Sequence, residues 1–309
     1  MQATRTFLQS LGLPPGDLRD VPTSSQRFPD GAQYRVEIPS VEGPGAMAAV
    51  LEEAGARSVP VVRISQGSGV MLLTDREIRE MARLGAEAGV EVSLFVGPRA
   101  AWETGAQALS PAGRNLGARH RGMEQLIYAI EDIKRACSLG IRGVLVADAG
   151  LLWVAGEMKK AGELPADLVL KVSVQMGAAN PASIRLQEQW GADTYNVPTD
   201  LNLAQLAAIR AAVDIPLDIY VEVPDNFGGF IRHYEIGEMV RVMAPVYLKF
   251  GLRNAPNVYP SGTHLEETVI ALSRERVRRA EIGLDHLRRT YPDAVTSKLG
   301  ATGLAVPQP

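Results

Sequence analysis

Charged and polar side chains alternate with apolar ones in several short segments of this chain. In the segment YRVEIPSV (34–41), Arg35 and Glu37 alternate with branched apolar residues. Because successive side chains of a β-strand point to opposite faces, the polar members of such a segment lie together on one face. Acids and bases gathered on one face can bind a charged substrate and transfer protons. The alternation therefore predicts a polar functional surface that is built by strands.

Over the whole chain, this polar face contains four cations, four anions and several neutral hydrogen-bonding groups. Its members are Arg35, Glu37, Arg63, Ser65, Ser93, Asp148, Lys171, Ser173, Gln175, Asn196, Asp218, Tyr220, Glu222, Tyr247 and Lys249. Buried charges are costly unless they are paired, and the equal numbers permit pairing within the protein. We expect Arg35, Lys171 and Asp218, near the N-terminal strand ends, to be structural. Members near the C-terminal strand ends are expected to form the site.

The apolar residues of the same segments are expected to face surrounding helices. They are Val36, Ile38, Val62, Ile64, Val92, Leu94, Leu145, Val172, Val174, Leu217, Ile219 and Leu248. In the segment GVLVAD (143–148), this assignment turns Leu145 toward the helices and Asp148 toward the interior.

Four of the inward residues are candidates for acid–base catalysis. They are Glu37, Asp148, Glu222 and Lys249. The candidates for substrate binding are three arginines, which suit carboxylate or phosphate groups, and three amides, which can orient a substrate. They are Arg63, Arg99 and Arg253, with Gln175, Asn180 and Asn196. This set predicts a small polar substrate that is anionic or zwitterionic.

Two alternatives remain open. A buried lysine can act as a nucleophile, so Lys171 or Lys249 can serve a lyase or aldolase as the Schiff-base residue, although pairing with carboxylates is the more common role of such a lysine. Alternatively, the chain is a non-catalytic subunit of a larger assembly. Its internal charges would then form a closed network with no cavity.

Few residues suit a metal or a covalent cofactor. The carboxylates Glu37, Asp148 and Glu222 can hold Mg²⁺ or Mn²⁺, but the neighbouring cations can neutralise them without a metal. The four histidines fall in no metal-binding spacing, so no metal ligand is assigned and the cofactor stays unknown. The single cysteine, Cys137, excludes a disulfide within one chain and a cysteine-based zinc or iron–sulfur site.

The segments that carry these residues alternate with stretches of helical spacing. The expected strands are 34–41, 59–65, 90–96, 143–148, 168–174, 193–197, 215–223 and 246–250. The expected helices are 46–56, 74–89, 123–140, 150–162, 180–192, 202–213, 233–244 and 265–291. Eight strand–helix units predict the α/β class and a single (β/α)₈ TIM barrel, in which active sites lie at the C-terminal strand ends.

Two segments interrupt this alternation. Residues 1–30 form an N-terminal arm that crosses the barrel base, contacts another subunit of a homo-oligomer, or remains a flexible tail. Residues 97–122 form a long loop after the third strand. It is either a lid that contacts the substrate or a solvated loop whose arginines serve solubility or subunit contacts. We therefore divide the chain into the arm 1–30, the barrel domain 31–292 and a C-terminal tail 293–309.

Composition limits the classes of function. The 309 residues are 46% hydrophobic, which suffices for a core and excludes disorder. The net charge of −3 gives no strong signal for nucleic-acid binding. No apolar run approaches the length of a membrane span, and the N-terminus has no signal-peptide pattern. A cytoplasmic protein with a small-molecule substrate is the expectation.

Three motifs in the middle of the chain resemble the barrel core of the collagenase-like peptidases, family U32. They are Asp148 with Gly150 after one strand, Gln175 with Asn180 after the next, and Gly191-Ala192-Asp193 before the third. The resemblance implies a barrel whose mouth is lined by Asp148, Gln175 and Asn180, and a hydrolase of the peptidase type. Relatives that hold an iron–sulfur centre do so with a cysteine cluster that this chain lacks, so no such centre is expected.

Overall fold

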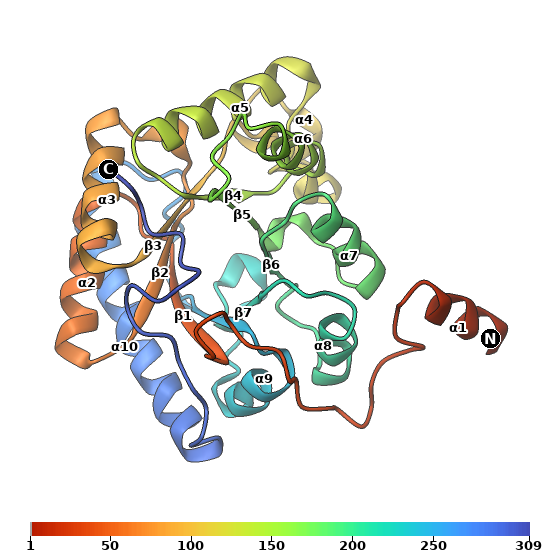
Figure 1. Ribbon diagram of the computed structural model, residues 1–309. Helices are drawn as coiled ribbons and strands as arrows, with labels where there is room; N and C mark the ends of the chain where they lie inside the picture. The colour runs from red at the N-terminus through yellow and green to blue at the C-terminus, as the bar shows by residue number, and fades with distance from the viewer. Residues whose placement is uncertain (1) are drawn as a thin grey trace.

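The segments with alternating polarity form the eight strands of a closed barrel. The computed structural model describes residues 2–309, and its strands are β1 (Tyr34–Pro39), β2 (Val61–Gln66), β3 (Glu91–Phe95), β4 (Gly143–Val146), β5 (Val169–Val172), β6 (Thr194–Asn196), β7 (Leu217–Glu222) and β8 (Val246–Phe250). Each strand pairs in parallel with the next, and β8 pairs with β1 (Figure 1). The prediction of a (β/α)₈ TIM barrel is confirmed.

A helix follows each strand and covers the outside of the barrel. These helices are α2 (Pro44–Arg57), α3 (Asp75–Ala88), α5 (Gly122–Ser138), α6 (Ala149–Lys160), α7 (Pro181–Gln189), α8 (Leu203–Arg210), α9 (Ile236–Met243) and α10 (Glu266–Thr290). Local sequence sets several of their ends. Thr74 and Glu77 form a capping box at the start of α3, and Gly89 ends that helix in the left-handed conformation.

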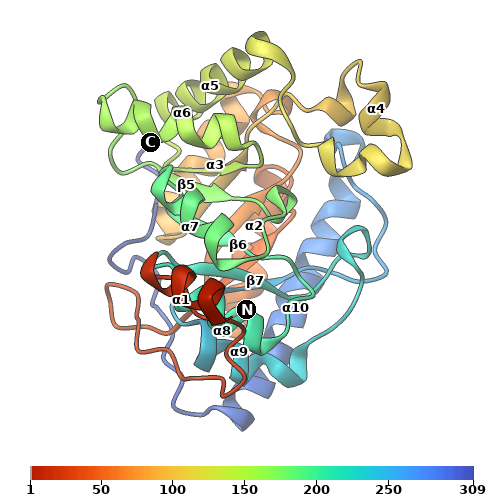
Figure 2. The same cartoon turned by 90° about the vertical axis from the view of Figure 1, so that its right-hand side faces the viewer.

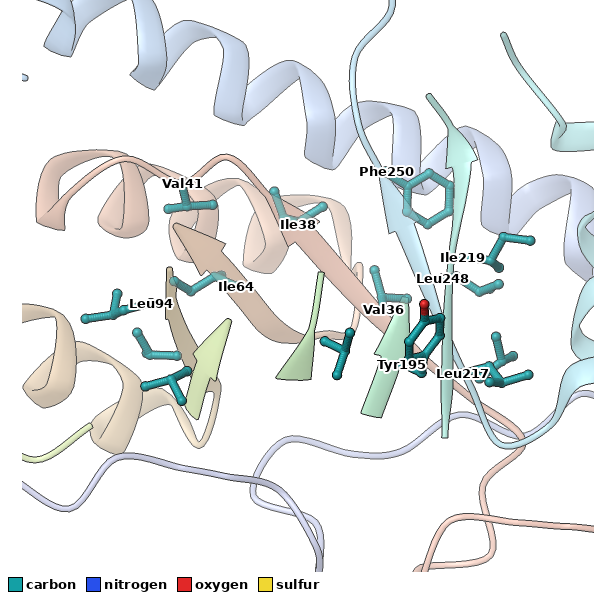
Figure 3. Packing of buried hydrophobic residues seen from close by; sticks show 14 of the residues in the cluster. Val36, Ile38, Val41, Ile64, Leu94, Tyr195, Leu217, Ile219, Leu248 and Phe250 are labelled. Atoms are coloured by element: carbon teal, nitrogen blue, oxygen red, sulfur yellow. The ribbon is translucent and has the colours of Figure 1, made fainter. Parts of the chain in front are cut away.

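The main hydrophobic core lies between the strands and this ring of helices. Figure 3 shows Ile38 and Phe250 in this layer. Phe250 packs against α10 at Gly283, where a Cβ atom would overlap its ring. Burial of such side chains stabilises the fold by roughly 1.5–3 kcal/mol each.

Two predicted orientations in this layer are wrong. Val62 packs inside the barrel base with Phe28 and Tyr247, because the pairing of β1 with β2 shifts register at this level. Leu145 points into the barrel mouth, where it packs with Phe95. The segment around Leu145 is apolar throughout, so the sequence does not show which of its side chains point inward. The predicted inward and outward faces were therefore exchanged.

Both chain ends close the base of the barrel. The Arg35 guanidinium, which is 1% exposed, stacks on the Phe28 ring, 4.0 Å from its centroid. The same group donates hydrogen bonds to the Ser297 hydroxyl at 2.8 Å and to the carbonyls of Thr302 at 3.0 Å and Gly303 at 3.1 Å. The C-terminal segment thus supplies the acceptors that a buried arginine requires.

The beginning of the arm stands away from the barrel in Figure 1, on the side of α7 and α8, and Figure 2 shows it from that side, in front of these helices. It forms a helix that the sequence analysis did not predict, α1 (Gln2–Ser10), and none of its residues is buried. Arg185 of α7 holds the next residues by donating to the carbonyls of Leu11 and Gly12. The predicted role of the arm in a homo-oligomer stays a prediction, as do the proposed domain boundaries.

The long loop after β3 is folded. It contains short helical turns, η2 (Ala100–Trp102), α4 (Ala106–Leu109) and η3 (Pro111–Leu116). Arg119 fixes its end over the barrel by donating to the carbonyls of Ala147, Gln175 and Met176. Within residues 2–309, no helix combines the length and apolar composition needed to cross a membrane.

Removal of residues 294–309 is expected to destabilise the barrel strongly, because Arg35 loses acceptors that each contribute about 1.5–3 kcal/mol to a charged group. Removal of residues 2–10 is the matched control, since α1 buries no residue. Urea unfolding followed by circular dichroism measures both changes. Equal midpoints for the two shortened chains would show that the tail does not close the base.

Candidate active site

The interior of the barrel holds a network of paired charges centred on Glu37. The Lys171 ammonium donates to the Glu37 carboxylate and, at 2.5 Å, to Asp218 Oδ2. Arg63 Nη1 lies 3.2 Å from both carboxylates. Because all four side chains are at most 2% exposed, each charge depends on these partners in place of water.

A carboxylate that the sequence analysis missed completes the network. Glu91 accepts from Arg63 Nε at 2.7 Å and from the Tyr247 hydroxyl at 3.0 Å. It stands two residues before Ser93, so the same alternation could have found it. With Lys249, the network contains three cations and three anions, and it is neutral as a whole.

Glu37 is held in its ionised form near neutral pH. Burial would raise the pKa of its carboxyl group, but Lys171, Lys249 and Arg63 outweigh burial and hold this pKa well below the ordinary value. The pKa of Lys171 is lowered to about 8, chiefly by burial and against the attraction of Asp218 and Glu37. Neither residue borders the cavity described next, so their positions suit structural roles. The acid–base role predicted for Glu37 has no support from this geometry.

A cavity of about 570 Å³ opens directly above this network, at the C-terminal strand ends. Ser65, Tyr220 and Lys249 reach it from inside the barrel, and Arg99, Trp102 and Arg114 line it from the loop after β3. No aspartate or glutamate of the described chain is among its lining residues. A second groove, of about 790 Å³, runs beside α3 and is lined by the charged side chains of Arg76, Arg79 and Arg83 among others.

Lys249 joins the cavity to the network. Its Nζ atom lies 2.5 Å from Asn196 Oδ1, 3.3 Å from Glu37 Oε1 and 4.4 Å from the centre of the Tyr220 ring. Asn196 is fully buried, and its amide nitrogen donates to the Val197 carbonyl. The second hydrogen bond fixes the direction of the Asn196 oxygen, so Asn196 positions Lys249 and does not itself reach the cavity.

Arg99 is a buried cation that forms no salt bridge within residues 2–309. Its guanidinium lies between two rings, 3.8 Å from the centre of Phe95 and 4.0 Å from that of Trp102, and only 6% of the residue is exposed. It donates to the Gly67 carbonyl at 2.6 Å, while its Nε atom has no partner among residues 2–309. Burial lowers the pKa of Arg99 to about 10. An anion in the cavity would relieve this cost.

Asp148 lies outside the cavity, contrary to the prediction. Its carboxylate caps α6 by accepting from the Leu151 amide at 3.0 Å and also accepts from the His120 amide at 3.2 Å. The error arises because the inward and outward faces of β4 were exchanged in the prediction. Leu145 and Ala147 occupy the inward positions, so Asp148 points outward. Asp148 therefore connects the loop after β3 to α6.

Glu222 also points away from the cavity. The pairing of β7 with β8 shifts register between Tyr220 and Glu222, and this shift turns Glu222 toward α10. There its two oxygens lie 3.2 Å from Arg279 Nη1, and one accepts from the Arg253 amide. Its predicted inward orientation is wrong.

The remaining binding candidates are dispersed. Gln175 lines the cavity, and its side-chain oxygen is buried with no partner within residues 2–309. Asn180 is an exposed cap of α7, Arg253 is exposed at the rim, and Arg63 lies below the floor within the network. Of the predicted set, the structure brings Lys249, Arg99 and Gln175 to one cavity.

These positions do not form a metal site. Glu37, Asp148 and Glu222 are separated from one another, and each is bound to groups of the protein. Within residues 2–309, no group of three or more histidine, cysteine or acidic side chains is arranged to hold a metal ion.

The fold and the site define a class, a TIM barrel with a cationic pocket at its C-terminal strand ends. Residues 114–223 match the sequence model of peptidase family U32, and over this segment the chain resembles that family. The matched segment contains Asp148, Gln175 and Asn180. It ends before Lys249 and begins after Arg99, so the resemblance does not extend to these two cations.

Solved structures show likeness at low sequence identity. A U32 peptidase is 19% identical, with a TM-score of 0.45, over 75% of this chain and 98% of its own. A truncated 3-deoxy-D-arabino-heptulosonate 7-phosphate synthase from Thermotoga maritima is 11% identical, with a TM-score of 0.48, over 86% and 91%. No curated protein sequence matches the chain.

Glu37→Gln is expected to cost about 3–5 kcal/mol of unfolding free energy near neutral pH, because it leaves buried cations uncompensated. Since the folded-state pKa of Glu37 is lowered, its stabilising effect is present above the ordinary value of 4.5 and is lost as the pH falls toward the folded-state pKa. The difference between wild type and variant should therefore shrink in acid. Urea unfolding at about pH 7 and about pH 3.5 measures it.

Glu80→Gln is the matched control, because Glu80 pairs with Arg83 on the exposed side of α3. It should leave stability essentially unchanged. A Glu37→Gln protein as stable as this control at neutral pH would contradict the central role of Glu37.

Proposed function

We propose that this chain is a TIM-barrel enzyme whose substrate is a small anionic molecule bound at the C-terminal strand ends. The observation that carries the proposal is Arg99, a buried cation that forms no salt bridge within residues 2–309, beside a cavity that no acidic residue of this range lines. Since a buried charge is costly without a partner, a bound anion would satisfy this group. Arg114 at the rim adds a second charge of the same sign.

Lys249 is the candidate for the reacting end of the substrate. An ammonium group has three N–H donors, and Asn196 and Glu37 can accept two of them. The third remains for a substrate oxygen in the cavity. A fixed ammonium at this place stabilises negative charge that develops on that oxygen. Asn196 and Glu37 are positioning residues in this proposal, and Gln175 orients the substrate from the wall.

A second candidate uses Lys249 as a Schiff-base nucleophile. Its support is the position of Lys249 at the cavity, whereas Lys171 is fully buried and paired with Glu37 and Asp218. The unprotonated Nζ would form the bond to a substrate carbonyl carbon, and the carbonyl oxygen would leave as water. The Nζ atom of Lys249 already donates to Asn196 and lies 3.3 Å from Glu37, so it is less free to attack a carbonyl, and this chemistry is the weaker candidate. A hydrolase of the peptidase type rests on the family resemblance alone.

The non-catalytic alternative predicted a closed charge network without a cavity. The network is closed, but the cavity of about 570 Å³ lies directly above it. This volume is within the usual range for small-molecule sites. The cavity therefore favours an enzyme over a purely structural subunit.

Arg99→Met is expected to weaken anion binding while the fold remains, because methionine can occupy the space beside the two aromatic rings and carries no charge. Acetate and inorganic phosphate should quench the fluorescence of Trp102 in the wild-type chain. The variant should bind them at least about tenfold more weakly, as expected for a lost charged hydrogen bond. Arg83→Met, which removes an exposed paired arginine, is the control. Binding that is absent in wild type, or unchanged in Arg99→Met, would refute the proposal.

Borohydride reduction tests the second candidate. Keto acids such as pyruvate, added with borohydride, should leave the mass of the chain unchanged if Lys249 remains an ammonium. A stable adduct on Lys249, absent from Lys249→Met, would instead support Schiff-base chemistry. Peptide mapping by mass spectrometry gives the result.

A further inference from the structure

The cavity is unusually rich in aromatic side chains. The whole chain has 6 Phe, 3 Trp and 8 Tyr in 309 residues. Five aromatic residues stand among the 24 that line the cavity, and they are Phe95, Trp102, Tyr220, Phe227 and Tyr259. About one lining residue in five is therefore aromatic, which is well above the 6% of the chain.

These residues come from strands and loops that are distant in sequence. Phe95 ends β3 and Trp102 lies in the loop after it, Tyr220 and Phe227 belong to β7 and its loop, and Tyr259 follows β8. Trp102, Phe227 and Tyr259 are only partly buried, and all three line the cavity. Separate hydrogen bonds hold two of them in place. The Tyr259 hydroxyl donates to Ser40 at 2.5 Å, and Thr199 donates to the Phe227 carbonyl at 2.9 Å.

The aromatic surface and the cations are adjacent. Arg99 stacks on Phe95 and Trp102, and Lys249 lies over Tyr220. Tyr220 in turn lies near Phe227, with their ring centres 6.3 Å apart and their planes 27° apart. A ligand that places an anionic group on Arg99 or Lys249 therefore extends along aromatic faces. Planar conjugated rings pack on such faces better than saturated rings do.

We propose that the substrate is an aromatic carboxylate, with its carboxylate at Arg99 and Lys249 and its ring against the exposed faces of Trp102, Phe227 and Tyr259. This inference rests on the proposed anion-binding function and narrows its substrate class. The unpartnered side-chain oxygen of Gln175 also suits a ligand that bears a hydrogen-bond donor on its ring.

Calorimetric titration of the full chain with four probes tests this inference. Benzoate and cyclohexanecarboxylate share size and charge, acetate has the charge without the ring, and benzyl alcohol has the ring without the charge. Benzoate should bind about fivefold more tightly than cyclohexanecarboxylate, as expected for aromatic packing beyond simple burial. Acetate should bind more weakly than both, and benzyl alcohol should bind weakest.

Two variants locate the preference. Phe227→Leu keeps an apolar side chain but removes a ring, so the preference for benzoate should fall toward onefold while acetate binding stays unchanged. Tyr234→Leu removes a ring that is 86% exposed outside the cavity and should change nothing.

Different outcomes would overturn the aromatic substrate and the anion-binding function. Equal binding of benzoate and cyclohexanecarboxylate, or a full preference in Phe227→Leu, would overturn the aromatic substrate and leave the anion site standing. Equal binding of benzyl alcohol and benzoate would overturn the anion site itself. Binding of none of the four probes would overturn both.

Discussion

Six ionised side chains share the interior of this barrel, and the site above depends on their pairing. Glu37 and Asp218 accept hydrogen bonds from Lys171 and Arg63. Glu91 also pairs with Arg63, and Lys249 pairs with Glu37 at the end of the network nearest the cavity. Ordinary barrels fill this space with branched apolar residues. Here each charge can remain buried only because a partner of opposite charge is held beside it. The partners lie on different strands, so a change in strand register would break the pairs.

The network gives the cavity a polarity that composition does not reveal. Its own charges cancel, and the acids Asp148 and Glu222 are used by helices and loops. Two of the cations at the cavity, Arg99 and Arg114, are thus left without acidic neighbours among its lining residues. A nearly neutral protein therefore presents a positive pocket, and neighbouring aromatic rings supply apolar surface within it.

Much of the fold could be predicted, because strong local signals agreed with the tertiary structure. All eight strands and their following helices were found within a few residues. The site was predicted less well. Lys249 and Arg99 reached the cavity, but Asp148 and Glu222 did not, since one lay after a uniformly apolar strand and the other after a register shift. Neither the direction of an apolar strand nor a register shift can be recognised from the alternation of polar and apolar residues.

The sequence by itself determined the barrel and the polarity of its interior, because strand and helix periods are local properties of the chain. It also located the resemblance to family U32 in the middle of the barrel. The tertiary structure alone decided which charges pair and which face the cavity. Pairing depends on contacts between residues as distant as Glu37 and Lys249, and the order of side chains along one strand does not encode them.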